Sequence, residues 1–346
     1  MDIDQTSDYS KWLRNLDQSI YYYPYDAPHY DLVRKLICDW LSETQSHVTA
    51  LRKLLIKLNG TIDVGICDSP LIGGYSEPGY DAETEQRSSL VQVNLGIFPK
   101  VLGLANRAHT ARFFGAHQPM VRDTFENWSV NETSVGILCL GAGHVDKDTY
   151  NSVNDCATLS FLHELAHCQE PFPAPTTPEQ SRAIEACADE GSGYLFARRI
   201  ASQHMMLKKP NEIEILNRIS DASFFLVALV YWASLGSEQK DYYHHPWTRM
   251  RCFLRGACFA LYGAEQNKWK QAFRIAWDRQ CEYALAFALF SPERLWFWQD
   301  QEEVSADWQL FLAKTHDRMI ELRDQLPPMF LLTPLTLGMK WIQHLR

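Results

Sequence analysis

Two histidines and a glutamate stand close together in the segment from His163 to His167, which reads HELAH. Side chains four residues apart lie one above the other on a helix face, so His163 and His167 can bind one metal ion. Glu164 is placed to reach a metal-bound water rather than the metal, and can act as its general base. The spacing therefore predicts a site that activates water, provided that the segment is helical and that a third ligand exists.

The residues around this motif favour a helix. Apolar residues recur at helical spacing between Cys156 and Ala166, and Asn154 or Asp155 offers an N-cap before them. The prolines that begin at Pro171 cannot continue a helix, so the sequence predicts that the helix ends there.

A second helix after the proline-rich loop offers the third ligand. The segment Thr177–Gln180 is typical of a helix start, with an N-cap, a proline at the first helical position and a capping-box partner. Glu185 can complete a His2Glu zinc site whose fourth position stays open for water. Asp189, one turn further along, can accept the spare ring N–H of a ligating histidine. The alternative is a solvated acidic face, in which Glu190 is a nearby competitor.

A third element, His244-His245-Pro246 followed by arginines, makes a family resemblance specific. Over about residues 150–260 the chain resembles the gluzincin zinc peptidases. Within them it is similar to the CAAX-prenyl-protease and heat-shock membrane-peptidase family and to the phage-exclusion metalloproteases. The resemblance implies that His245 hydrogen-bonds the developing oxyanion and that Arg251 supports the site. The alternative for His244 and His245 is an ordinary loop pair before a proline.

The composition indicates a globular chain with a well-filled core, because 46% of the 346 residues are hydrophobic. The formal net charge of −9 argues against general nucleic-acid binding. The chain opens without the apolar stretch of a signal peptide, and its longest apolar run, Phe224–Leu235, is shorter than the about 20 residues of a transmembrane helix. Nine scattered cysteines do not suggest a disulfide framework. We therefore expect a cytoplasmic location, in the producing cell or in a host cell after delivery.

The pattern along the chain predicts a helical N-terminal segment over residues 1–60 and a zinc metallopeptidase domain over 61–346. Within this domain we expect a sheet in 61–140, the metal site in 150–255 and a helical part in 256–346.

Three short apolar runs are the strand candidates: Thr61–Cys67, Leu90–Ile97 and Ser134–Leu140. In zinc peptidases of the resembled kind, the strand before the metal helix is a sheet edge that holds an extended peptide. Ser134–Leu140 is predicted to be that strand, although an ordinary interior strand would give the same pattern.

These observations predict an α+β fold, mainly helical, in which a small β-sheet packs on the HExxH helix and the C-terminal half is helical. The expected function is that of a zinc-dependent endopeptidase with an intracellular protein or peptide substrate. Two alternatives remain: a zinc hydrolase of a non-peptide substrate, and a non-catalytic interaction or effector module. An accessible edge strand beside the site would favour the peptidase. A closed small pocket would favour the hydrolase of a non-peptide substrate. Absence of zinc from the purified protein would favour the non-catalytic module.

Overall fold

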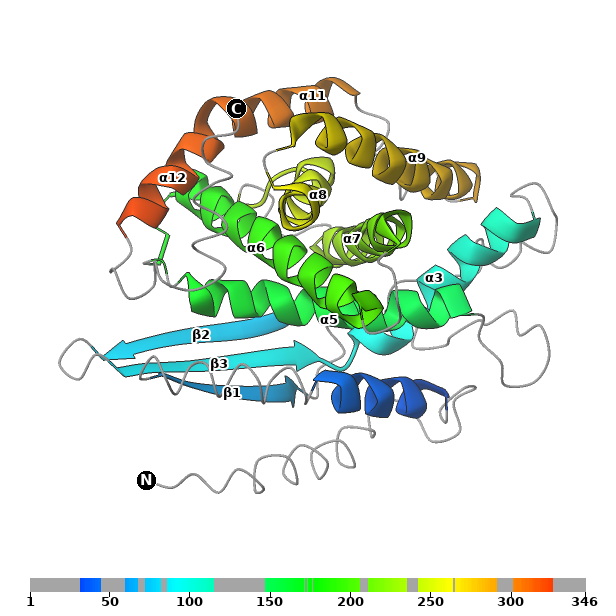
Figure 1. Cartoon of the computed structure of the whole chain (residues 1–346), viewed down its shortest axis with the longest axis horizontal. Helices are drawn as coiled ribbons and strands as arrows, with labels where there is room; N and C mark the ends of the chain where they lie inside the picture. The colour runs from blue at the N-terminus through cyan, green and yellow to red at the C-terminus, as the bar shows by residue number, and fades with distance from the viewer. Residues whose placement is uncertain are drawn as a thin grey trace.

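The computed structural model describes residues 32–44, 60–67, 72–81, 86–114, 147–170, 172, 174–175, 177–205, 211–234, 242–263, 265–290 and 301–325. Within these residues the chain is mainly helical and contains one three-stranded sheet (Figure 1). This confirms the predicted fold class. No helix in the described part of the chain is both long enough and apolar enough to cross a bilayer.

The sheet consists of β1 (Gly60–Cys67), β2 (Gly74–Asp81) and β3 (Gln86–Asn94), in the order β1-β3-β2. β1 pairs with β3 in parallel, and β2 pairs with β3 in the antiparallel direction. Among the described residues β2 therefore has one strand partner, β3, and forms an edge of the sheet.

Of the three strand candidates, Thr61–Cys67 is confirmed as β1, which begins one residue earlier. Leu90–Ile97 overlaps β3, but that strand ends at Asn94 because the chain turns there and enters a helix at Ile97. Ser134–Leu140 lies outside the described residues. β2 was not predicted, because glycine and proline are depleted in strands and its sequence, GYSEPGYD, contains three such residues. Its pairing with β3 outweighs this unfavourable composition.

The helices follow the sheet in the chain, apart from an earlier helix over residues 32–44. They are α3 (Ile97–Phe114), α5 (Lys147–Gln169), α6 (Pro178–Met205), α7 (Glu212–Ser234), α8 (Pro246–Tyr262), α9 (Gln266–Phe290), α11 (Gln301–Leu310), the π-helix η4 (Phe311–Thr315) and α12 (His316–Asp324).

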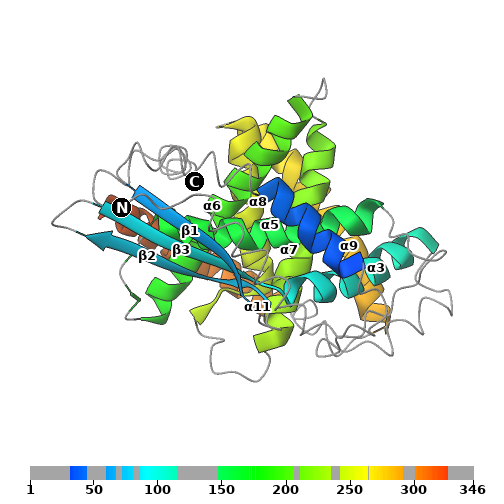
Figure 2. The same cartoon turned by 90° about the horizontal axis from the view of Figure 1, so that it is seen from below.

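Helix α5, which carries HExxH, lies at the centre of the molecule. Figure 1 shows it between the sheet on one side and α6 and α7 on the other. The helix of residues 32–44 crosses beneath it (Figure 2), where the indole of Trp40 donates a hydrogen bond of 3.1 Å to Thr158 Oγ1. Most of α5 is consequently buried, including polar residues such as Ser160. A helix buried on both sides holds its side chains in fixed positions.

The predicted end of α5 is confirmed, but its predicted start is wrong. The helix begins at Lys147, so Asn154 and Asp155 lie in its interior rather than at an N-cap. Asp155 forms an ion pair instead of a cap: Arg218 of α7 donates two hydrogen bonds to its carboxylate, of 2.7 and 2.6 Å. The predicted start of α6 is confirmed, since Thr177 Oγ1 accepts a hydrogen bond of 3.2 Å from the backbone N–H of Gln180.

Helices α6 and α8 approach each other so closely that only glycine fits at the crossing. A Cβ atom on Gly193 of α6 would collide with the backbone of Phe253, and one on Gly256 of α8 would collide with the backbone of Glu190. The contact sets the face of α8 that lies against α6. It therefore determines which side chains of α8 reach the acidic residues of α6.

Candidate metal centre

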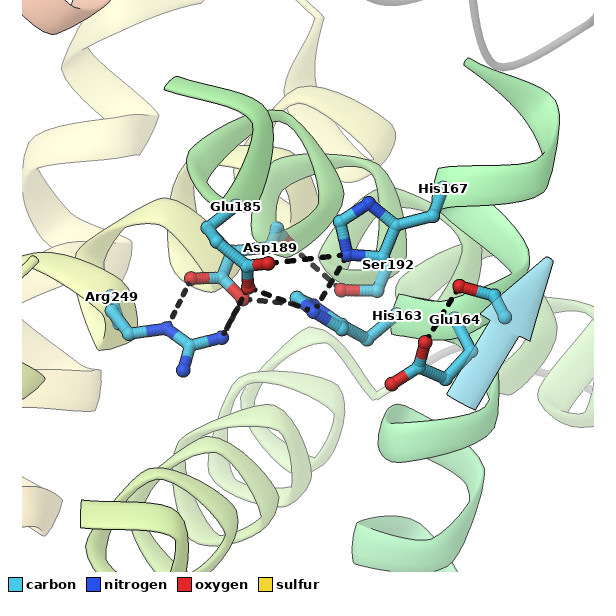
Figure 3. A network of polar contacts seen from close by, with 8 residues as sticks. His163, Glu164, His167, Glu185, Asp189, Ser192 and Arg249 are labelled. Atoms are coloured by element: carbon cyan, nitrogen blue, oxygen red, sulfur yellow. Dashed lines mark hydrogen bonds and ion pairs between the residues drawn. The ribbon is translucent and has the colours of Figure 1, made fainter. Parts of the chain in front are cut away.

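His163, His167 and Glu185 point toward one another from two helices (Figure 3). The two Nε2 atoms of the histidines lie 3.2 Å apart, and the carboxylate oxygens of Glu185 lie 3.3 Å from His163 Nε2 and 3.6 Å from His167 Nε2. Ligands held at zinc's usual distance of about 2.0–2.1 Å in a tetrahedral site are separated by ~3.4 Å. The two imidazole nitrogens and the Glu185 carboxylate, which faces His163 with Oε2 and His167 with Oε1, are therefore close enough together to hold a metal ion.

The pKa values of the three groups reflect their burial and their close contact. Burial would lower the pKa of His163, but its contacts with Asp189 and Glu185 outweigh burial and raise that pKa to about 10. Burial would raise the pKa of Glu185, but His163, His167 and Arg249 bring it down to about 2. Burial lowers the pKa of His167. His163 thus has a carboxylate at each ring nitrogen, and a divalent cation could replace the proton at Nε2, the nitrogen that faces Glu185.

Asp189 and Arg249 lie directly behind His163. Asp189 Oδ1 is 3.0 Å from His163 Nδ1, the ring nitrogen that faces away from the donor cluster. Arg249 of α8 holds the same carboxylate with two hydrogen bonds, of 2.9 Å from Nε and 2.8 Å from Nη2. Its Nη2 also lies 3.6 Å from Glu185. This is the arrangement that fixes the orientation and tautomer of a ligating histidine.

Glu164 is held apart from the three donors by the edge strand. Ser76 of β2 donates a hydrogen bond of 2.8 Å from its hydroxyl to Glu164 Oε2. A Cβ atom on Gly74, two residues earlier, would lie 2.6 Å from Glu164 Cγ, so the absence of a side chain there makes room for the glutamate. The carboxylate is thus beside the donor cluster without belonging to it.

A cavity of about 140 Å³ connects these groups. Its polar side is lined by His163, Glu164, Glu185, Tyr243 and Arg249. Tyr243 and Arg249 were not predicted as site residues. The guanidinium of Arg249 lies 5.2 Å from the centre of the Tyr243 ring, so the two side chains form one wall. The negative charge of Glu185 and burial raise the pKa of Tyr243, which keeps its hydroxyl a hydrogen-bond donor.

His245 does not line this cavity. It is the N-cap residue of α8, where its Nδ1 accepts a hydrogen bond of 3.3 Å from the backbone N–H of Trp247. The neighbouring His244 is also buried, and its ring bridges Asp307 and Thr315 at 3.0 Å each. These contacts connect His244, in the segment just before α8, to the C-terminal helices.

Arg251 lies away from the donors as well. Its guanidinium is 4.6 Å from the ring centre of Trp308 and 5.5 Å from that of Trp277. Arg249, two residues earlier, is the arginine of α8 that contacts Asp189 and Glu185. The sequence carried a signal for this: Arg249 is seven residues before Gly256, so both lie on the face of α8 that meets α6.

Comparison of the chain with protein families, with curated proteins and with solved structures finds no match. The described residues by themselves show a mainly helical protein in which His163, His167 and Glu185 form a group that can hold a metal ion.

Proposed function

We propose that the chain is a zinc-dependent peptidase that uses His163, His167 and Glu185 to hold the metal. The observation that carries the proposal is the division of the acidic groups in the site. Glu185 is 3.3 Å from His163 Nε2, whereas Glu164 is hydrogen-bonded to Ser76 on the edge strand. A three-ligand set with an open fourth position and a separate carboxylate is the arrangement of catalytic zinc sites that use water.

A zinc ion in this position would polarise the scissile carbonyl and lower the pKa of a bound water to about 7. Glu164 would take the proton of that water and deliver it to the leaving amine. Ser76 engages one carboxylate oxygen, Oε2, and so leaves Oε1 as the proton acceptor. Asp189 and Arg249 would keep His163 in the orientation that presents Nε2 to the metal.

Tyr243 is the better placed donor for the developing oxyanion. It lines the cavity together with Glu164 and Glu185, whereas His245 caps α8 and does not line it. A tyrosine hydroxyl can donate a hydrogen bond to the charge that forms on the carbonyl oxygen. We therefore assign to Tyr243 the role that the family resemblance implied for His245.

Two features favour a peptide over a small-molecule substrate. The cavity of about 140 Å³ is partly open rather than closed, and it is smaller than the ~300–1,000 Å³ of pockets that enclose whole ligands, so most of the substrate would lie outside it. β2, whose Ser76 contacts Glu164, has β3 as its strand partner among the described residues and can pair with an extended peptide along its other edge. β2 is therefore the described strand that we propose holds the peptide.

Cleavage mapping with wild-type protein and Glu164→Gln tests this proposal. The substitution keeps the shape of the side chain and removes its basicity, so zinc content should be retained. Hydrolysis should fall by roughly 10²–10⁴-fold, the usual contribution of a general base. Glu179→Gln, on the exposed first turn of α6, is the matched control and should cleave like wild type. Near-normal cleavage by Glu164→Gln would exclude the mechanism.

A further inference from the structure

We propose that the cavity beside the metal site is a subsite for one compact aliphatic side chain of the substrate, next to the bond that is cleaved. This inference rests on the proposed peptidase function and adds the class of residue that the enzyme selects.

The lining of the cavity also includes apolar side chains, which form what we call its apolar wall. Helix α7 contributes Leu226, Val227 and Val230, which lie on adjacent positions of one helix face. Phe253 of α8 and Ile72, just before β2, complete this wall. Leu226 and Val227 are 6% and 3% exposed, so their positions are fixed by packing. An aliphatic side chain placed against them would exchange water for a surface of matching character.

The charged groups of the cavity offer little to a charged substrate side chain. Arg249 is held by two hydrogen bonds to Asp189, and Glu185 is engaged by His163 and His167. Glu164 is reserved for the proton transfer in the proposed mechanism. A lysine or aspartate side chain placed against the apolar wall would therefore lose its hydration without gaining an opposite charge there, which is unfavourable.

The volume of the cavity limits the size of the side chain. An apolar cavity of about 150 Å³ holds a benzene molecule, and a water molecule takes about 30 Å³ of liquid volume. The cavity here, of about 140 Å³, must also contain the attacking water. The remaining space fits valine or leucine, whereas tryptophan would exceed it.

Binding of peptide hydroxamates to the zinc-loaded full chain tests the inference. The series carries glycine, alanine, valine, leucine, tryptophan, aspartate or lysine at the position next to the hydroxamate, and titration calorimetry gives each Kd. Each buried methylene group is worth roughly a fourfold change in affinity. We expect leucine and valine to bind at least about tenfold more tightly than glycine, aspartate, lysine and tryptophan.

A cavity-filling variant locates the subsite. Val230→Phe, at a half-buried position of the wall, should abolish the advantage of leucine and leave the glycine compound unchanged. Ile213→Phe is the control, since this residue of α7 is 57% exposed and does not line the cavity. It should behave like wild type.

The outcomes distinguish failure of the subsite alone from failure of the peptidase proposal. If zinc is bound and all hydroxamates bind equally, or if the charged compounds bind best, the subsite is wrong and the metal site stands. If the protein takes up no zinc, the proposed function and the subsite both fall. Should Val230→Phe not fold, the ranking obtained with the wild-type chain still decides the matter.

Discussion

Replacement of Arg249 by methionine probes the support behind the metal site. The Asp189 side chain is 1% exposed, and Arg249 supplies the two hydrogen bonds that compensate its charge. The pKa of Arg249 shows the same coupling, because burial would lower it but the adjacent Asp189 raises it. Removing the guanidinium leaves a buried carboxylate whose remaining partner is His163.

The expected cost follows from this burial. Breaking a buried ion pair by removing one partner costs about 3–5 kcal/mol. For a chain of 346 residues the entropy of unfolding is about 0.7 kcal/mol/K, so one kcal/mol corresponds to about 1.4 °C and Tm should fall by roughly 4–7 °C. Because Asp189 orients His163, zinc affinity should also fall, by roughly 10–100-fold.

Arg251→Met is the matched control, since it makes the same change two residues along the same helix. Arg251 lies over Trp308 and Trp277, and cation–π contacts of this kind contribute about 0.5–1 kcal/mol at exposed sites. Thermal unfolding and competition with a zinc chelator measure both quantities in both variants. Unchanged zinc affinity in Arg249→Met, or a greater loss in Arg251→Met, would refute the reasoning.

Ser76→Ala should lower kcat by roughly tenfold or more with KM and zinc content unchanged, because a hydrogen bond to a charged group contributes about 1.5–3 kcal/mol. Ser76→Thr should restore kcat, and an unaltered kcat in Ser76→Ala would contradict this. Burial would raise the pKa of Asp307, but hydrogen bonds from His244, Thr248 and the backbone of His245 lower it. Asp307→Asn should therefore destabilise the chain near pH 7, and urea unfolding should show the difference disappearing as the pH falls below about 4 through the lowered pKa; a difference independent of pH would argue against it. His244→Ala should lower the free energy of unfolding by about 1–3 kcal/mol, because it leaves buried partners unsatisfied, and an unaffected midpoint in urea would show that the contacts do not matter.

The parts of the site that could be predicted from sequence are those set by local helix geometry. His163 and His167 share a face because they are four residues apart, and Thr177 marks the start of the helix that carries Glu185 through cap chemistry. In each case the relevant neighbours are within one or two turns, so spacing alone carries the information.

The parts that could not be predicted depend on contacts between distant segments. Arg249 faces Asp189 because α6 and α8 cross at glycines, a contact between segments about 60 residues apart in the chain. β2 is a strand because it pairs with β3, although its own sequence disfavours one. Asp155 was predicted to be a helix cap, because its actual partner, Arg218 of α7, is 63 residues away in the sequence. The hydrogen bond between Ser76 and Glu164 likewise joins residues 88 positions apart, so it could not be predicted from local sequence.

The most direct test of the central claim is the zinc content of the purified full chain after equilibration with zinc and removal of excess metal. Wild-type protein and Glu164→Gln should each hold one equivalent, because Glu164 is not a ligand in the proposed site. The double variant His163→Ala with Glu185→Ala should hold close to none, since two of three donors are removed. One equivalent of zinc in the double variant, or none in the wild-type protein, would contradict the account.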